Sequence, residues 1–281
     1  MANRLEPGAS PKRVVSLIPS MTDSFLTLGL GRYLVGITDY CPLPESKQDV
    51  RRVGGTKDAR TDDILALRPD LVIANREENS PLLVEALESA GMKVWVTFPR
   101  TVRQALSDLT EIALGYPEEK TLQRVVWLER AVDWLEGARG KAPRTFFCPI
   151  WRDGPVSSPD GWMTFNQDTY AHDLLSLCGG ENVFAARTDA RYPRVTREEI
   201  SLAAPELVLL PSEPFPFTED DVDGFLTQFP DLPAVKHMRI LRVDGRHVFW
   251  HGTRLGESIR VIPEILLSGN LALGCMPDEK V

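Results

Sequence analysis

Aromatic and arginine side chains gather just after predicted strands in this sequence. Most of them lie at the carboxyl ends of strands, where open parallel α/β sheets bind their ligands. Aromatic faces beside a guanidinium suit a large, flat, partly anionic small molecule. The alternative for any single aromatic residue is ordinary packing under a loop. The candidate ligand-binding residues of this kind are Tyr40, Trp151, Arg152, Trp162, Phe165, Tyr192, Trp250, His251 and Arg254.

Sequence motifs that carry catalytic chemistry are missing. The chain has no GxSxG nucleophile elbow, no phosphate-binding loop and no HExxH zinc motif. Gly29 and Gly31 follow a predicted helix instead of opening one, which indicates a turn and not a dinucleotide site. We therefore expect no enzyme activity and no protein-ligated metal. Direct binding of a metal ion such as zinc is kept as a further interpretation, with His251, Cys41 and Asp168 as conceivable ligands.

Composition restricts the class of partner. The 281 residues are 43% hydrophobic and 26% charged, which is typical of a globular protein of two ordinary domains. A net charge of −8 is unsuited to binding nucleic acid phosphates. No stretch approaches the roughly 20 apolar residues that cross a bilayer. We expect a monomer that binds a small molecule.

The N-terminus and the cysteines bear on the cellular compartment. The segment MANRLEPGASPKR has no apolar run that could act as a secretory signal. As it stands, the sequence predicts a cytoplasmic protein. If an export segment is missing from the sequence as given, the protein is instead expected in the periplasm or at the cell surface. Cys41, Cys148, Cys178 and Cys275 are widely spaced and form no CxxC pair, which favours reduced, partly buried thiols.

Strand-like and helical segments alternate along the chain, as in parallel βα units. A long helix at 117–139 interrupts this alternation, and no Gly/Ser linker accompanies it. We predict an α/β fold of two Rossmann-like lobes with parallel sheets, joined by one long rigid backbone helix, with the ligand cleft between the lobes. The expected parts are 1–116, 117–140 and 141–281. The expected strands are 14–17, 34–38, 71–74, 93–97, 145–149, 207–210, 240–243 and 247–249, with an irregular stretch up to Phe165.

Helix starts are predicted from capping residues. Ser20 with the acid Asp23 three residues later, and Thr196 with Glu199, both have capping-box spacing. The expected helices are those starting at Ser20 and Thr196, and 61–67, 81–90, 102–114, 168–177 and 258–267.

One short pattern occurs twice. "DDILALRPDLVIAN" at 62–75 and "EEISLAAPELVLLP" at 198–211 align at a constant offset, so that Pro69 matches Pro205 and each copy opens with an acid, Asp62 or Glu198. Each copy predicts a helix, a proline stop and a buried strand. The repetition indicates two related lobes.

Several motifs in the same order resemble a known family. They are "RVVSLIPSMTD" at 13–23, "LVGITDYC" at 34–41, "ILALRPDLVIA" at 64–74, "CGGENVF" at 178–184 and "VTREEI" at 195–200. Over nearly its whole length the chain resembles the helical-backbone (class III) substrate-binding proteins of metal-chelate importers, among them the vitamin B12 binders. The resemblance implies a corrinoid such as cobalamin or cobinamide, or another metal chelate, as ligand, with no intrinsic cofactor, and an ABC permease as partner.

The resemblance also implies roles for particular residues. Pro19, Tyr40, Trp162, Tyr192 and Arg254 stand at ligand-contacting positions of the family. Thr56 and Asn75 occupy two positions where B12 binders can carry tryptophan. Asp62 and Glu198 correspond to the acids that dock on permease arginines, although acids at a helix N-terminus are also explained by the helix dipole alone.

The alternatives belong to other classes of protein. A cytosolic ligand carrier or an enzyme of the same fold fits the lack of a visible signal, and a direct metal-ion binder fits the scattered histidines. The lack of a recognisable acid–base or nucleophile arrangement speaks against the enzyme.

Overall fold

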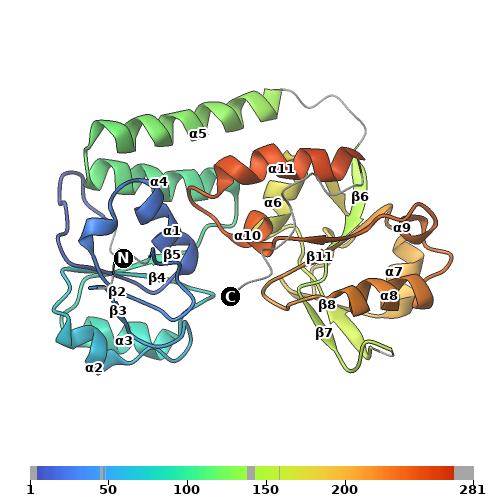
Figure 1. Ribbon diagram of the computed structural model, residues 1–281, viewed down its shortest axis with the longest axis horizontal. Coiled ribbons are helices and arrows are strands. Elements are labelled where there is room, and N and C mark those ends of the chain that lie inside the picture. Colours follow the sequence, from blue (N-terminus) through green and yellow to red (C-terminus); the bar gives the residue numbers. More distant parts are fainter. Residues whose placement is uncertain (1–4, 45–46, 48, 138–142, 158, 269–281) are drawn as a thin grey trace. The chain divides into compact units, whose positions relative to one another are not determined.

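The computed structural model describes residues 5–44, 47, 49–137, 143–157 and 159–268. They form two compact α/β units (Figure 1). The first unit takes the described residues up to Pro99, then Arg103–Arg130 and His251–Arg254. The second takes Arg100–Val102, Ala131–Trp250 and the described residues from Leu255 onward. The domain bounds expected from the sequence, 1–116, 117–140 and 141–281, stay a prediction.

The first unit is built on a five-stranded parallel sheet in the order β3-β2-β1-β4-β5. Helices α2 and α3 cover one face of it, and α1 and α4 cover the other (Figure 1). The order reverses direction at β1, which is where an open α/β sheet binds ligands. The elements are β1 Val14–Ser16, α1 Pro19–Thr27, η1 Gly31–Tyr33, β2 Leu34–Ile37, β3 Arg51–Arg52, α2 Thr61–Ala66, β4 Leu71–Asn75, α3 Pro81–Ser89, β5 Val94–Thr97 and α4 Val102–Gly115.

The second unit has a four-stranded parallel sheet in the order β12-β11-β6-β9 and a small antiparallel sheet in the order β10-β8-β7. A core of phenylalanines, Trp162 and aliphatic side chains packs between the parallel sheet and α7, α8 and α9. The elements are β6 Arg144–Phe147, β7 Trp151–Asp153, β8 Gly161–Met163, α6 Tyr170–Leu177, β9 Gly180–Asn182, β10 Arg194–Val195, α7 Arg197–Ala203, β11 Leu207–Pro211, α8 Glu219–Gln228, α9 Pro233–Lys236, β12 Ile240–Val243, α10 Gly245–Phe249 and α11 Leu255–Ser268.

The long helix α5, Glu119–Gly137, belongs to the first unit up to Arg130 and to the second from Ala131. Val125, Leu128 and Val132 are buried along one face, as the spacing predicts. The end of this helix expected near Arg139 lies outside the described residues. None of the helices that the structure describes is long and apolar enough to span a bilayer. The predicted fold class, parallel α/β lobes joined by a long helix, is confirmed.

The repeat seen in the sequence is also present in the backbone and in the hydrogen bonds. Arg68 and Ala204, each just before the shared proline, both adopt a left-handed φ of 47°. Asp70 accepts hydrogen bonds from the backbone N–H groups of Lys12 and Arg13 at 2.8 and 2.9 Å. Its counterpart in the second copy, Glu206, accepts the N–H and hydroxyl of Thr145 at 3.0 and 3.2 Å. In both copies, therefore, the acid after the proline anchors the start of the neighbouring strand.

One of the two helix starts predicted from a capping box is wrong. Helix α1 begins at Pro19, with Ile18 as N-cap and no side-chain cap, because proline lacks the N–H that the first turn leaves unpaired anyway. Ser20 is buried and is not the cap, so the capping box with Asp23 does not form there. The second predicted capping box is confirmed: Thr196 and Glu199 bond each other's backbone at the start of α7.

Two predictions about strands are also wrong. His247–Phe249 is not a strand but the end of α10, because the Asp244 carboxylate caps the helix by accepting the Arg246 N–H at 2.9 Å. The stretch expected to be irregular contains β7 and β8. These strands are only three residues long, which is too short for an alternating pattern to be recognised.

Candidate functional site

Tyr40 projects from the turn that follows β2 and is 70% exposed. The Arg52 guanidinium fixes this turn, because its Nη1 donates to the carbonyl oxygens of Thr38 and Asp39 at 2.9 and 2.8 Å. Gly55 lies close to the ring: a Cβ at that position would be 3.3 Å from Cε2 of Tyr40. Tyr40 thus presents an aromatic face at the carboxyl edge of the first sheet, as the sequence predicted.

Cys41 points inward from the same turn and is buried. The Thr22 hydroxyl donates to its sulfur at 3.1 Å, and the Thr38 hydroxyl lies at the same distance. Burial raises the pKa of this thiol. A protonated, enclosed thiol is a poor ligand for a metal ion. Cys41, Cys148 and Cys178 are free thiols, and Cys275 lies outside the described residues.

Asn75 is committed to shaping the loop after β4. Its Oδ1 accepts the N–H of Glu77 at 2.8 Å, and its Nδ2 donates to the Thr97 hydroxyl at 3.3 Å. Asn79 extends this network by donating to the Thr56 carbonyl at 2.9 Å. Because Asn75 is only 5% exposed, it offers no stacking surface. The two positions where B12 binders can carry tryptophan therefore form part of a polar loop network.

Residues 251–254 pack against helix α1 in the first unit. His251 is buried, with Nε2 3.4 Å from the Ser20 hydroxyl, and burial lowers its pKa to about 4. Arg254 donates from Nη2 to the Asp23 carboxylate at 3.2 Å. Pro19 is buried at the start of the same helix. The structure thus brings Pro19, His251 and Arg254 together in the first unit.

Trp162 is a core residue of the second unit. It lies in β8, is 2% exposed, and packs against Phe225 and Phe229 at centroid distances of 5.6 Å. Its expected place in an irregular loop is wrong. Phe165 is buried too, between Phe146 and Phe249. Both positions argue for packing, whereas their ligand contacts stay predictions.

Met163, the neighbour of Trp162, is half-buried. In β8 successive side chains alternate, so Met163 points away from the core. It pairs with Trp151 on β7 and with Arg194 on β10. Trp151 is 46% exposed and meets Phe215 edge to face at 5.1 Å. Met163 was missed because the letters "GWM" alone do not reveal which side chain of a strand faces the core.

The arginine at 152 has a partner within the second unit. Its Nε donates to the buried Asp221 carboxylate at 2.7 Å, and its guanidinium lies 5.2 Å from the Phe215 ring centre. Arg152 therefore contacts both the Asp221 carboxylate and the Phe215 ring, which in turn packs against Trp151. Tyr192 precedes β10 and is half-buried, with the Arg191 guanidinium 5.7 Å from its ring centre, and Trp250 is half-buried after α10.

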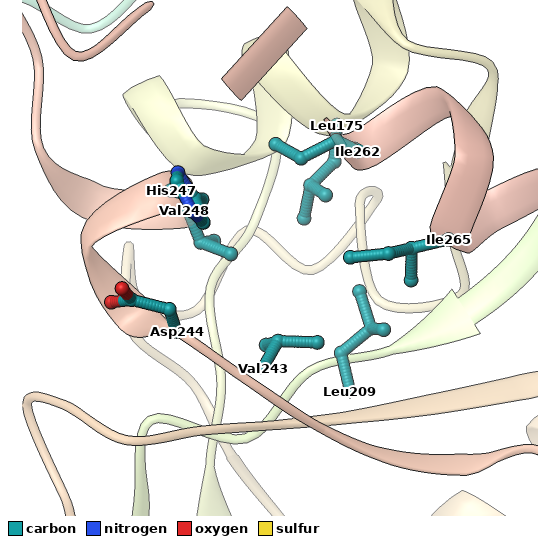
Figure 2. Close-up of a pocket in the computed structure, with 8 residues that line it drawn as sticks. All are labelled: Leu175, Leu209, Val243, Asp244, His247, Val248, Ile262 and Ile265. Carbon is teal, nitrogen blue, oxygen red and sulfur yellow. The ribbon is translucent and has the colours of Figure 1, made fainter. Parts of the chain in front are cut away.

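Two hollows lie elsewhere in the second unit. Figure 2 shows the smaller, about 10 Å³, enclosed by Leu175, Leu209, Ile262 and Ile265 among others, with the Asp244 carboxylate at its edge. It is a packing defect barely large enough for one water molecule. The larger, an open groove of about 850 Å³, includes Arg144 and Gly180, the first residues of β6 and β9. It therefore lies at the amino ends of these strands, opposite the edge where parallel sheets bind ligands.

Histidine spacing does not create a metal centre. His247 and His251 stand four residues apart, but α10 ends at Phe249, so they do not share a helical face. Asp168 is exposed in the second unit, where its N–H donates to Asn166. Within the described ranges, no group of three or more His, Cys, Asp or Glu side chains is arranged to hold a metal ion.

The two acids of the repeat are at equivalent places. Asp62 is exposed in the first turn of α2, and Glu198 is exposed in the first turn of α7. Hydrogen bonds from its own backbone N–H and from the Thr196 side chain lower the pKa of Glu198. Both acids are thus accessible, and Glu198 is held in its ionised form near neutral pH.

Comparison with known proteins decides the family. The vitamin B12-binding protein of Yersinia pestis (strain Pestoides F) is 31% identical over 209 residues, which cover 73% of this chain and 71% of the relative. The chain belongs to the vitamin B12-binding protein family. The resemblance predicted from the motifs is therefore confirmed. No protein-family model matches the chain.

Solved structures of the class III substrate-binding fold match it throughout. The periplasmic vitamin B12 binding protein BtuF of Vibrio cholerae superposes with a TM-score of 0.77 at 20% identity, covering 92% of this chain and 98% of that one. The periplasmic heme-binding protein RhuT of Roseiflexus sp. RS-1 gives 0.75 at 21% identity, covering 92% and 97%. Members of the B12-binding family and heme binders thus share this fold.

Proposed function

We propose that this protein is a substrate-binding protein that holds a corrinoid or a related metal chelate for an ABC importer. The observation that carries the proposal is its 31% identity to a vitamin B12-binding protein across most of both chains. The ligand is bound and released without covalent chemistry. Affinity then comes from buried apolar surface and a few fixed polar groups.

Each unit contributes side chains suited to such a ligand. In the first, Tyr40 supplies an exposed ring and Arg254 a guanidinium fixed on helix α1. In the second, Trp151 and Met163 supply apolar surface beside Tyr192. Aromatic rings and a polarisable thioether pack well against a flat macrocycle. We propose that these residues contribute to ligand binding.

Asp62 and Glu198 are the proposed contacts with the permease. Their equivalent positions in the two copies of the repeat suit a partner with two related arginine-lined surfaces. Carboxylate–guanidinium pairs at such a contact are charge-assisted and geometrically specific. Replacement of both by asparagine and glutamine should abolish importer-dependent uptake while leaving ligand affinity unchanged. Loss of ligand affinity in the same double variant would contradict this role.

Titration with defined chelates tests the ligand. Cyanocobalamin, dicyanocobinamide and hemin are added separately to the purified protein, and binding is followed by the visible spectrum and by calorimetry. We expect saturable binding of at least one of them with one molecule per chain. Failure of all three at high micromolar concentration would refute the chelate-binding function.

A ligand carrier that works in the cytosol is the competing function. Fractionation of cells that express the full native gene separates the two. An importer component is expected in the periplasm or at the cell surface. Recovery of all the protein in the cytosol, together with chelate binding, would favour the carrier.

A further inference from the structure

A four-residue segment, His251–Arg254, is docked on helix α1 although the chain on both sides of it belongs to the second unit. The Thr253 N–H donates to the Ser24 hydroxyl at 3.1 Å, and that hydroxyl donates to the Ser20 carbonyl at 2.8 Å. Gly252 has a φ of +93°, and a Cβ there would lie 2.2 Å from the Ser24 oxygen. The backbone of the segment is therefore held closely to one face of α1.

The side chain of Arg254 is held in the same place by a carboxylate. Its Nη2 lies 3.2 Å from Oδ1 of Asp23, and the two side chains are only 17% and 16% exposed. An arginine has a long flexible stem, so a fixed partner greatly reduces the number of rotamers it samples. Partial burial also means that salt screens this attraction less than it would at the open surface.

The pairing changes the chemistry that Arg254 offers to a ligand. A guanidinium carries five N–H donors, and its nitrogen Nη2 lies within hydrogen-bond distance of one oxygen of the Asp23 carboxylate. The pair as a whole has no net charge. A guanidinium in such a pair attracts anions less strongly than an unpaired arginine does, which favours neutral acceptors such as carboxamide oxygens over carboxylates.

We propose that Asp23 is a positioning and specificity-determining residue: through Arg254 it selects metal chelates decorated with amides over those decorated with carboxylates. This inference rests on the proposed function for the contact between Arg254 and the ligand. Corrinoids such as cobinamide display amide side chains around the ring. Heme displays propionates, and dicyanocobyrinic acid keeps the corrin ring but replaces the amides by carboxylates.

The test compares two ligands with the same ring. The dissociation constants of dicyanocobinamide and dicyanocobyrinic acid are measured for the wild type and for Asp23→Asn. We expect the wild type to prefer the amide, and Asp23→Asn to shift the ratio of the two constants toward the acid by about tenfold, because the guanidinium loses its counter-charge. Asp23→Glu restores the charge and should keep the wild-type preference.

Two further variants separate a specific effect from a general one. Asp63→Asn removes a carboxylate from the ion pair with Arg60 in the same unit and should leave the ratio unchanged. In an Arg254→Gln background, Asp23→Asn should have no further effect on the ratio, since Asp23 acts through that arginine. The proposal would be overturned if Asp23→Asn left the ratio of the two dissociation constants unchanged. It would also be overturned if Asp23→Asn shifted this ratio in the Arg254→Gln background as much as it does in the wild-type background.

Hydrogen exchange gives a readout that needs no ligand. Asp23→Asn should speed amide exchange at Thr253 and Arg254, whereas Asp63→Asn should not; unchanged exchange overturns the positioning role. Binding of hemin but of neither corrinoid to the wild type would overturn the amide preference and leave chelate binding standing. Failure to bind cyanocobalamin, dicyanocobinamide and hemin alike would refute the proposed function itself.

Discussion

Trp151 and Met163 lie directly opposite each other across the antiparallel β7–β8 ladder, and Met163 faces Arg194 on its other side. Side chains at such paired positions lie about 5 Å apart, so they act as one surface. This row places an aromatic ring, a thioether and a cation on one face of a three-stranded sheet. Trp162, between Gly161 and Met163, faces the opposite way into the core.

The first prediction concerns the exposed face of that sheet. Trp151→Ala and Met163→Ala should each raise the dissociation constant of the chelate that the wild type binds. We expect a change of about tenfold, because each substitution removes apolar contact area. Titration followed by the visible spectrum measures the change. Trp127→Ala is the matched control, since Trp127 is 59% exposed on α5. If this control weakens binding as much as Trp151→Ala does, the face is not the site.

The second prediction separates packing from binding at Trp162. Its ring fills the core between β8 and α8, so Trp162→Ala should lower the unfolding free energy by about 3–5 kcal/mol. Trp151→Ala should lower it by less than about 1 kcal/mol. Urea denaturation followed by circular dichroism measures both. Equal stability of the Trp162→Ala protein and the wild type would contradict the core placement.

The third prediction uses the left-handed backbone that ends α7. Ala204 has a φ of 47°, a conformation that costs a residue with a Cβ about 1 kcal/mol but costs glycine little. Ala204→Gly should therefore raise the unfolding free energy, by at most about 1 kcal/mol because glycine also loosens the unfolded chain. Ala203→Gly, one residue earlier and inside the helix, should lower it by a similar amount. Opposite signs for these neighbours are the expected result of urea denaturation, and a loss of stability in both would contradict it.

The fourth prediction is a pH dependence that comes from His251. Burial lowers the pKa of this imidazole from an ordinary value of 6.5 to about 4. The unfolded chain therefore takes up a proton at a higher pH than the folded chain does, so stability present above pH 6.5 is lost as the pH falls toward 4. The loss amounts to at most about 3 kcal/mol.

Comparison with His251→Gln isolates this contribution. Burial lowers the pKa of His172 as well, but that residue is present in both proteins and cancels in their difference. The unfolding free energies of the two proteins should converge between pH 6.5 and 4. Parallel curves over this interval would show that His251 is accessible to protons in the folded protein.

Local sequence patterns determined the fold class and the repeat, because each depends on neighbours along the chain. The motif before Pro69 and Pro205 predicted two equivalent helix–strand units, and the left-handed residues Arg68 and Ala204 occur at the same point of each. Tyr40 was correctly placed in the turn after a strand for the same reason. The capping box at Thr196 needed only residues three apart.

Tertiary structure alone decided which side chains meet and which face outward. The ion pair of Asp23 joins residues 231 positions apart in the chain, so no local spacing could reveal that this acid pairs with Arg254 instead of capping a helix. The choice between Trp162 and Met163 depended on which face of β8 packs on α8. Local patterns determine secondary structure through short-range sterics and hydrogen bonds, whereas burial and long-range pairing arise only when the whole chain packs.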